Sequence, residues 1–504
     1  MEKREKFTNK RYSGVLMHIS SLPGPYGIGS FGRAARDFGK FLYASGQKYW
    51  QVLPLGPTGF GDSPYQSFSS FAGNPYFIDL DSLLEAGLLR EEDLAFHKEG
   101  WKPNKVDYSR LSRERLGILK MAFENFSKTC AYQDFVKENS FWLEDYSLFM
   151  AIKETRDQKP WYQWEPGLKF RQTQALENFI KANSQLIEFY SFVQFLFFSQ
   201  LWDLKKYLKT LDIDLIGDLP FYVAMDSADA WAHPEIFHFD ENLDPIYVAG
   251  VPPDYFSQTG QLWGNPIYKW DFLKETAYKW WIDRIGYSLK IYDLLRIDHF
   301  RGFESFWQIP FGQDTAINGT WVKGPAMDFF QQVEKDLGQV GLIAEDLGLL
   351  TKEVEDFVRE TAFPTMKVLE FSYDPQGSNK YLPHNCEKNS VSYIGTHDNT
   401  TLRAWYEGAS QEEKDFFKDY FNLRTEENLN WQLIRGLLTG PSKLAIIQAQ
   451  DLLNLGATAR MNTPGSLGDN WTWRMEEGAL TEAIAEKLRR LSQVSGRHNN
   501  LFFA

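Results

Sequence analysis

Three short apolar runs in this 504-residue chain lead into an acidic residue, and this pattern constrains the fold more than any other feature. The acids are Asp298 after 294–297, Glu345 after 341–344, and Asp398 after 392–397. Short apolar runs of this kind are typical of buried parallel strands. In a barrel of alternating strands and helices, acids at strand ends gather at the open end where chemistry takes place. Three carboxyl groups gathered there suit the cleavage of a glycosidic bond.

Further apolar runs alternate with amphipathic segments along the chain. We predict strands over residues 12–19, 49–55, 213–219, 293–297, 342–345, 366–371, 392–396 and 457–462. Between them, segments such as 31–44, 326–337 and 352–360 have helical periodicity. Strands and helices in this alternating order predict an α/β fold, a (β/α)8 TIM barrel.

Two stretches exceed what a minimal barrel needs. Residues 83–181 are charged, aromatic and mostly helical in pattern, which predicts a helical insertion after the second strand. Residues 225–285 are loop-rich in pattern around 250–253, which predicts a lid insertion after the third strand. We expect residues 1–504 to form a single elaborated barrel with no separate C-terminal β-domain.

Composition excludes several classes of function. The net charge of −13 argues against nucleic acid or an anionic membrane as a partner. Cys130 and Cys386 are the two cysteines, so we expect neither a disulfide framework nor a cysteine metal cluster. The charged start of the chain runs into no apolar stretch, and 192–202 is too short to span a bilayer. We expect a cytoplasmic protein.

The aromatic content is high, at 16% with 17 Trp. For a single Trp, ordinary core packing is the simplest explanation. Many of these aromatics, however, lie beside Gly, Pro, Asn and Asp, as in 73–77, 253–256, 262–266 and 469–473. Flat loop aromatics can stack on sugar rings while amide and carboxylate groups bind the hydroxyls. Composition therefore favours a carbohydrate ligand.

A dinucleotide site is the main competing motif. Gly27–Gly32 fits the G-x-G-x-x-G pattern. Pro23 and Pro25 nevertheless separate it from the preceding strand, and the strand over 49–55 offers no acid for a ribose hydroxyl. The acidic segment 240–244 lacks the spacing of a calcium loop. We expect no nucleotide, no other cofactor and no metal.

The neighbours of the three acids suggest different roles. Arg296 and Asp298 share one face of a strand, and a neighbouring guanidinium favours an ionised carboxylate. Glu345 ends an apolar strand, where desolvation raises its pKa and suits a general acid. His397 and Asp398 could bind sugar hydroxyls. A structural ion pair, a loop acid and a hydrogen-bonded turn are the respective alternatives.

Several motifs in order resemble the 4-α-glucanotransferases known as amylomaltases or disproportionating enzymes, glycoside hydrolase family 77 of the α-amylase clan. The resemblance extends from Ser13 to Gly465. The motifs are Gly61–Gln66, Gly217–Tyr222, Gly250–Phe256, Arg296–Gly302, Ala344–Gly348, Thr396–Asn399 and Asn462–Gly465.

The resemblance implies a retaining double displacement on α-1,4-glucans, with glucose or another glucan as acceptor. It makes Asp298 the nucleophile, Glu345 the general acid and base, and Asp398 the acid that holds the ring hydroxyls. A retaining mechanism needs nucleophile and acid carboxyls about 5–5.5 Å apart. The residues that would bind substrate are Tyr65, Asp218, Asp254, Tyr255, Phe256, Trp263, Arg296, His299, His397 and Asn462.

Two alternatives remain at this point. An α-amylase-like α-1,4-glucan hydrolase would share the three acids, and a non-catalytic glucan-binding protein would share the fold. Against hydrolysis, we expect the aromatic lid around Tyr255, Phe256 and Trp263 to exclude water and align the acceptor sugar. We expect a monomer or a weak homodimer.

Overall fold

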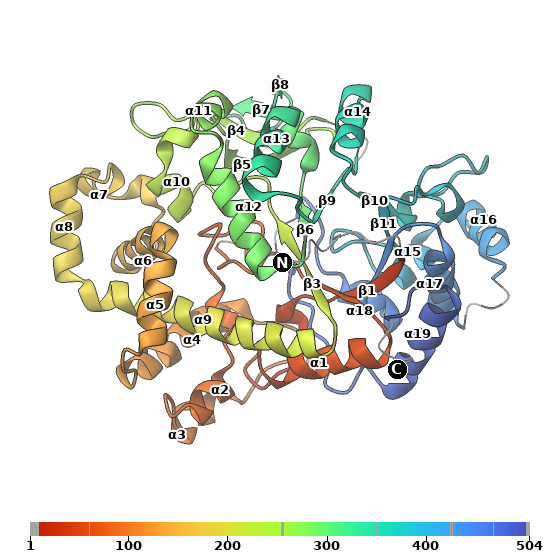
Figure 1. Ribbon diagram of the computed structural model, residues 1–504, viewed down its shortest axis with the longest axis horizontal. Coiled ribbons are helices and arrows are strands. Elements are labelled where there is room, and N and C mark those ends of the chain that lie inside the picture. Colours follow the sequence, from red (N-terminus) through yellow and green to blue (C-terminus); the bar gives the residue numbers. More distant parts are fainter. Residues whose placement is uncertain are drawn as a thin grey trace.

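The computed structural model describes residues 10–59, 61–253, 257–348, 350–423, 425, 427–466 and 468–499. Within them, parallel strands form a closed barrel (Figure 1). The barrel strands are β1 (Tyr12–Leu16), β2 (Tyr49–Gln51), β3 (Asp214–Leu219), β6 (Leu294–Ile297), β9 (Leu342–Ala344), β10 (Thr365–Val368), β11 (Ser390–Tyr393) and β12 (Leu444–Gln448). Their order around the barrel is β1-β12-β11-β10-β9-β6-β3-β2. The TIM-barrel prediction is confirmed.

The barrel strands are apolar because they are covered on both faces. All residues of β6, β9, β11 and β12 are buried. Gly14 allows β1 and β2 to approach closely, since a Cβ at this position would lie 2.4 Å from the carbonyl oxygen of Tyr49.

The prediction of an eighth strand at 457–462 is wrong. The eighth strand is β12, which pairs with β1 on one side and β11 on the other. Residues Ala457–Ala459 form a 3-10 turn instead, and Thr458 is exposed. The polar side chains of Thr458, Arg460 and Asn462 could not be buried on both faces, whereas Leu-Ala-Ile-Ile-Gln in β12 can. The other seven predicted strands each overlap a barrel strand, although several of them extend too far.

Helices cover the outside of the barrel. Before β3 they are α1 (Arg33–Ala44), α2 (Leu80–Glu85), α3 (Glu91–Leu94), α4 (Tyr108–Glu124), α5 (Cys130–Glu138), α6 (Ser140–Thr155), α7 (Pro166–Lys169), α8 (Thr173–Ala182) and α9 (Ser184–Thr210). After β3 they are α10 (Ala228–Ala232), α11 (Trp270–Glu275), α12 (Lys279–Ile291), α13 (Ala326–Leu337), α14 (Lys352–Thr361), α15 (Leu402–Gly408), α16 (Gln411–Phe421), α17 (Leu429–Thr439), α18 (Ala449–Leu452) and α19 (Glu482–Val494).

The helices between β2 and β3 gather on one side of the barrel (Figure 1). Most of residues 83–181 are helical, and the long helix α9 packs against α4, α5 and α6 as well as against α1. Its buried residues include Phe192, Phe197 and Leu201, so its apolar stretch is part of the core. Among the described residues, no helix combines the length and the apolarity needed to cross a membrane.

A second, antiparallel sheet lies over the end of the barrel. It was not predicted from the sequence. Its strands are β4 (Tyr247–Val251), β5 (Gln261–Pro266), β7 (Ser305–Pro310) and β8 (Thr320–Lys323), in the order β5-β4-β7-β8. The first two follow β3 and the last two follow β6. The 225–285 segment therefore contributes two strands to a shared sheet, where the sequence suggested loops.

Arg497 stabilises the barrel at the place where β1 lies beside β12. Its side chain is fully buried and has no carboxylate partner among the described residues. It donates hydrogen bonds to the carbonyl oxygens of Tyr12, Leu438, Gly440, Ser442 and Lys443. Burial lowers the pKa of Arg497 to about 9. These bonds join β1 to the segment between α17 and β12.

We expect Arg497→Met to lower the free energy of unfolding by about 3–5 kcal/mol, because it removes the hydrogen bonds of a buried guanidinium to five backbone carbonyl groups. Urea unfolding followed by circular dichroism measures this change. Arg113→Met, at an exposed position on α4, is the matched control. Equal unfolding midpoints for the two variants would contradict the role given to Arg497.

Candidate active site

The register of three adjacent strands brings the central residues together. Asp218 in β3 lies opposite Arg296 in β6, and Ile297 lies opposite Ala344 in β9. The ladder continues one residue further, because the Asp298 amide donates to Leu219 O at 3.0 Å and the Glu345 amide donates to Ile297 O at 3.2 Å. Asp298 and Glu345 thus occupy neighbouring strand ends, and neighbouring strands are about 4.8 Å apart.

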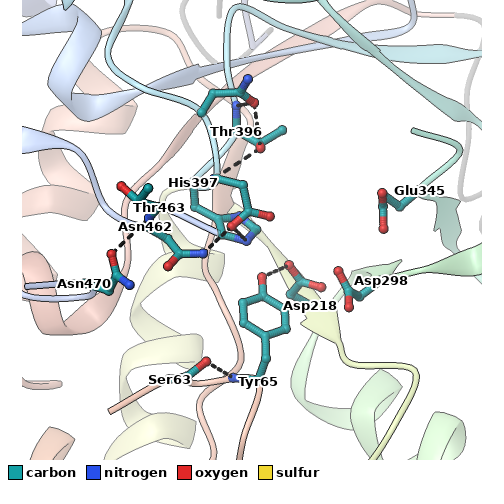
Figure 2. A network of polar contacts seen from close by, with 12 residues as sticks. Ser63, Tyr65, Asp218, Asp298, Glu345, Thr396, His397, Asn462, Thr463 and Asn470 are labelled. Carbon is teal, nitrogen blue, oxygen red and sulfur yellow. Dashed lines mark hydrogen bonds and ion pairs between the residues drawn. The ribbon is translucent and has the colours of Figure 1, made fainter. Parts of the chain in front are cut away.

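Arg296 contacts three acidic residues of this site. Its Nη1 lies 2.7 and 2.6 Å from the two carboxylate oxygens of Asp218. Its Nη2 lies 3.1 Å from Asp298 Oδ1 and 3.5 Å from Glu345 Oε2. The Arg296 side chain is only 4% exposed, so the guanidinium is almost removed from water and depends on these carboxylates. Figure 2 shows the carboxyl groups of Asp218, Asp298 and Glu345 gathered in one region.

The protonation of the two strand-end acids is set by burial and by Arg296. Burial raises the pKa of Glu345, while Arg296 and the amide of His299, which donates to Glu345 Oε2 at 2.5 Å, oppose the rise. This direction agrees with the sequence prediction. The predicted contact of Arg296 with Asp298 is also present, but burial raises the pKa of Asp298 as well, and Arg296 only opposes this effect. Arg296 lies closer to Asp298 than to Glu345, whereas the His299 amide contacts Glu345.

The third acid, Asp398, lies in the loop between β11 and α15. Asn462 Nδ2 donates to Asp398 Oδ1 at 2.6 Å, and His397 Nε2 lies 3.4 Å from the same oxygen. Arg460 donates to the backbone carbonyls of Asp398 and Asn462. The Asp398 side chain is 44% exposed, so its carboxylate remains open to a ligand. Burial lowers the pKa of His397, which keeps its imidazole neutral at pH 7.

Tyr65 connects the two halves of the site. Its hydroxyl donates to Asp218 Oδ2 at 2.8 Å, and its ring stacks on His397 with 5.2 Å between centroids (Figure 2). The Asp218 side chain has no exposed surface. Its observed contacts therefore hold Arg296 and Tyr65, and the carboxylate is closed off from solvent.

His299 and Trp263 lie on the Glu345 side of the site. His299 has φ of +47°, a left-handed conformation that non-glycine residues adopt infrequently. This turn aims its amide at Glu345. The Trp263 ring in β5 meets the His299 ring edge to face at 4.9 Å. Burial lowers the pKa of His299 to about 3, so this imidazole is neutral too.

Three of the residues predicted to bind substrate, Asp254, Tyr255 and Phe256, lie outside the described residues. Arg460 was missed as a site residue because its segment was assigned to a strand, although an Arg two positions before Asn462 could have signalled a loop anchor. Within the part of the chain that the structure describes, no group of three or more His, Cys, Asp or Glu side chains is placed to hold a metal ion.

Comparison with known proteins identifies the family. A family model described as 4-alpha-glucanotransferase, glycoside hydrolase family 77, matches residues 17–481. The chain belongs to this family. It is 48% identical to the 4-alpha-glucanotransferase of Clostridium butyricum over 95% of its own length and all of that relative's. It is 46% identical to that of Thermus thermophilus over 97% of its own length and 99% of the relative's.

Solved structures agree with this membership of the 4-α-glucanotransferase family. The amylomaltase from Streptococcus agalactiae, solved in complex with acarbose, superimposes with a TM-score of 0.95 at 41% identity. The match covers 97% of this chain and 100% of that one. Amylomaltase from Corynebacterium glutamicum, at 18% identity and a TM-score of 0.79, shares the fold. The transferase names of the high-identity relatives favour a transferase over the amylase-like alternative.

We expect Arg296→Met to destabilise this family member more at pH 8 than at pH 5. Without the cation, folded Asp298 and Glu345 keep their protons to higher pH than in the unfolded chain, where carboxyl pKa values are about 4. The folded protein then binds more protons, so the free energy of unfolding falls as the pH rises above about 4. Removing one partner of a buried ion pair costs about 3–5 kcal/mol, which we expect near pH 8.

Urea unfolding at both pH values tests this. Arg359→Met, which removes an exposed ion pair with Asp356 on α14, is the control and should show no such pH dependence. If Arg296→Met lost the same free energy at both pH values, the carboxyl groups would not depend on the guanidinium.

Proposed function

We propose that this protein is a 4-α-glucanotransferase that moves segments of α-1,4-glucan to the 4-hydroxyl of glucose or another glucan. The observation that carries the proposal is the placement of Asp298 and Glu345 at the ends of adjacent strands, around one guanidinium nitrogen of Arg296. A short separation between nucleophile and acid is what a retaining mechanism requires, roughly 5–5.5 Å. Membership of the family supports the same reaction.

In the first displacement, the Asp298 carboxylate attacks C1 of the donor sugar. Glu345 gives its proton to the glycosidic oxygen, the C1–O bond breaks, and the shortened glucan leaves with that proton. Asp298 is then covalently bound to the sugar through C1, with inverted configuration. Arg296 favours a charge on Asp298, and burial raises the pKa of Glu345, which favours the protonated form that a general acid needs.

In the second displacement, Glu345 acts as the base. It takes the proton from the 4-hydroxyl of the acceptor, whose oxygen attacks C1 and releases Asp298 as a carboxylate. Two inversions restore the α configuration. Glu345 ends protonated, as it began, so the cycle consumes no external acid or base. The reaction uses carboxyl groups alone and we assign no cofactor to it.

Asp398 and its neighbours hold the donor ring. The exposed carboxylate of Asp398 accepts hydrogen bonds from the 2- and 3-hydroxyls, and its charge stabilises the oxocarbenium-like transition state. Asn462 and neutral His397 fix the orientation of Asp398 and can bind hydroxyls themselves. Asp218 and Tyr65 act by holding Arg296 and His397 in place.

Transfer to a sugar must compete with transfer to water. Trp263 packs against His299, which follows the nucleophile directly and binds Glu345 through its amide. We assign Trp263, together with Tyr255 and Phe256, to a wall that excludes water and aligns the acceptor. Correct alignment of a bound acceptor can outweigh the higher concentration of water.

The two catalytic carboxyl groups can be told apart by trapping. With α-maltosyl fluoride, whose leaving group needs no protonation, Glu345→Gln should form the glycosyl-enzyme and fail to release it. Asp298→Asn should form none, because it lacks the nucleophile. Mass spectrometry of the intact protein and of its peptides measures the adduct and locates it on Asp298.

With maltotriose, we expect both variants to lose activity by roughly 10²–10⁴-fold or more. An adduct on Asp298→Asn, or an adduct located on Glu345 in the wild type, would reverse the two roles. Normal turnover by both variants would refute the catalytic roles assigned to Asp298 and Glu345.

We expect Trp263→Ala to raise the ratio of hydrolysis to transfer severalfold. Hydrolysis creates a new reducing end and transfer does not, so a reducing-end assay beside product chromatography gives the ratio. Trp321→Ala, at a partly exposed position on β8 of the same sheet, is the matched control. An unchanged ratio in Trp263→Ala would remove Trp263 from the water-excluding wall.

A further inference from the structure

Two acidic residues that the proposed reaction does not use lie behind the loop that carries Asp398. Glu370 follows β10 in the 3-10 turn Leu369–Phe371, and Asp451 lies in α18 after β12. Asp451 is buried, and the Oε1 atom of the half-buried Glu370 is closed off from solvent. Together they flank residues 395–402, the connection from β11 to α15.

Glu370 holds the beginning of this loop. Its amide donates to the carbonyl oxygen of Ile394 at 3.1 Å. A Cβ on Gly395 would lie 2.6 Å from Glu370 Oε1, so the absence of a side chain there lets the carboxyl group reach the backbone. The Asn399 side chain lies beside Glu370 at Gly395, and Asn399 Oδ1 accepts from the amide and hydroxyl of Thr396, both at 3.0 Å. Glu370 is thus linked through Asn399 to the residue that precedes His397.

Asp451 holds the end of the same loop. Its Oδ1 accepts from the Leu402 amide at 2.8 Å, in the first turn of α15. Its own carbonyl oxygen accepts from Asn430 Nδ2 on α17 at 3.0 Å. Asp398 lies between these two anchors, so its position depends on both ends of the loop.

The surroundings of the two acids favour their neutral forms. Burial raises the pKa of Asp451 to about 7 and that of Glu370 well above its usual range, and the charge of Asp451 raises the pKa of Glu370 further. Arg460 and Asn399 oppose the effect at Glu370, and the Leu402 amide opposes it at Asp451. Glu370 Oε1, Asp451 Oδ2 and Gln448 Nε2 have no hydrogen-bond partner among the described residues. A neutral acid tolerates an unpartnered buried oxygen better than a carboxylate does.

We propose that Glu370 is a positioning residue whose neutral carboxyl group holds the 395–402 loop, so that His397 and Asp398 face the donor sugar. The inference rests on the proposed function for the role of Asp398. When Glu370 and Asp451 both lose their protons, two like charges face each other behind the loop, and the loop is displaced. The contact of Glu370 with the loop therefore weakens as the pH rises and the two carboxyl groups lose their protons.

The sign of the pH effect follows from proton binding. Both groups have carboxyl pKa values of about 4 in the unfolded chain. Between this value and the higher pKa of the folded state, the folded protein binds more protons, so its free energy of unfolding falls as the pH rises. A neutral amide in place of either acid removes that contribution.

Four proteins test the proposal: the wild type, Glu370→Gln, Glu370→Ala and, as an exposed control on α14, Glu360→Gln. Steady-state kinetics with maltotriose at pH 6.5 give kcat and KM, and thermal unfolding at pH 5 and pH 8 gives Tm. We expect Glu370→Ala to lower kcat about tenfold or more, because a displaced loop misplaces Asp398. Glu370→Gln, which keeps shape and neutrality, should restore kcat to within about threefold of the wild type.

We also expect Tm to fall less between pH 5 and pH 8 in Glu370→Gln than in the wild type and in Glu360→Gln. The proposal is overturned if Glu370→Ala keeps the wild-type kcat, or if the Tm of Glu370→Gln depends on pH as the wild type's does. A wild type that folds but leaves maltotriose unchanged would refute the proposed function instead, and the Tm comparison would still decide the role of Glu370.

Discussion

The site depends on a single buried cation. Arg296 lies almost out of water, and a charge in such a place is stable only when partners of opposite charge surround it. Asp218 on β3 lies directly opposite Arg296. Asp298 follows the end of β6, two residues beyond Arg296, and Glu345 follows the neighbouring strand β9. The guanidinium fork can contact several carboxylates at once, which a lysine ammonium could not do in the same geometry.

This arrangement links the fold to the chemistry. The barrel register decides which residues are neighbours, and burial at the strand ends decides how strongly they interact. Burial alone would favour protons on both Asp298 and Glu345. Arg296 lies 3.1 Å from Asp298 and 3.5 Å from Glu345, and the His299 amide donates to Glu345, so the proposed nucleophile and the proposed acid have different surroundings. The antiparallel sheet places Trp263 of β5 against His299, so the 225–285 segment contacts the same centre.

Local patterns in the sequence predicted the three acids and most of the barrel strands. They failed where the paired segments are far apart along the chain. An apolar run that ends in an acid is visible in the sequence, which is why Asp298, Glu345 and Asp398 could be chosen. Strand β12 was missed because Leu444–Gln448 ends in no acid, and a polar segment nearby was chosen instead. The antiparallel sheet was missed because β4 and β7 come from different insertions. The raised pKa of Asp298 and the link from Glu370 to Asn399 depend on burial and on distant contacts, which no local pattern shows.

Three acids in a barrel suit hydrolysis and transfer equally well, so the central claim is that a sugar and not water receives the donor. Incubation of the wild-type protein with maltotriose, followed by chromatography of the products over time, tests it most directly. Transfer gives glucose together with a ladder of maltooligosaccharides longer than maltotriose, and no net increase in reducing ends; this is the result we expect. Glucose and maltose alone, with reducing ends rising as maltotriose disappears, would contradict it.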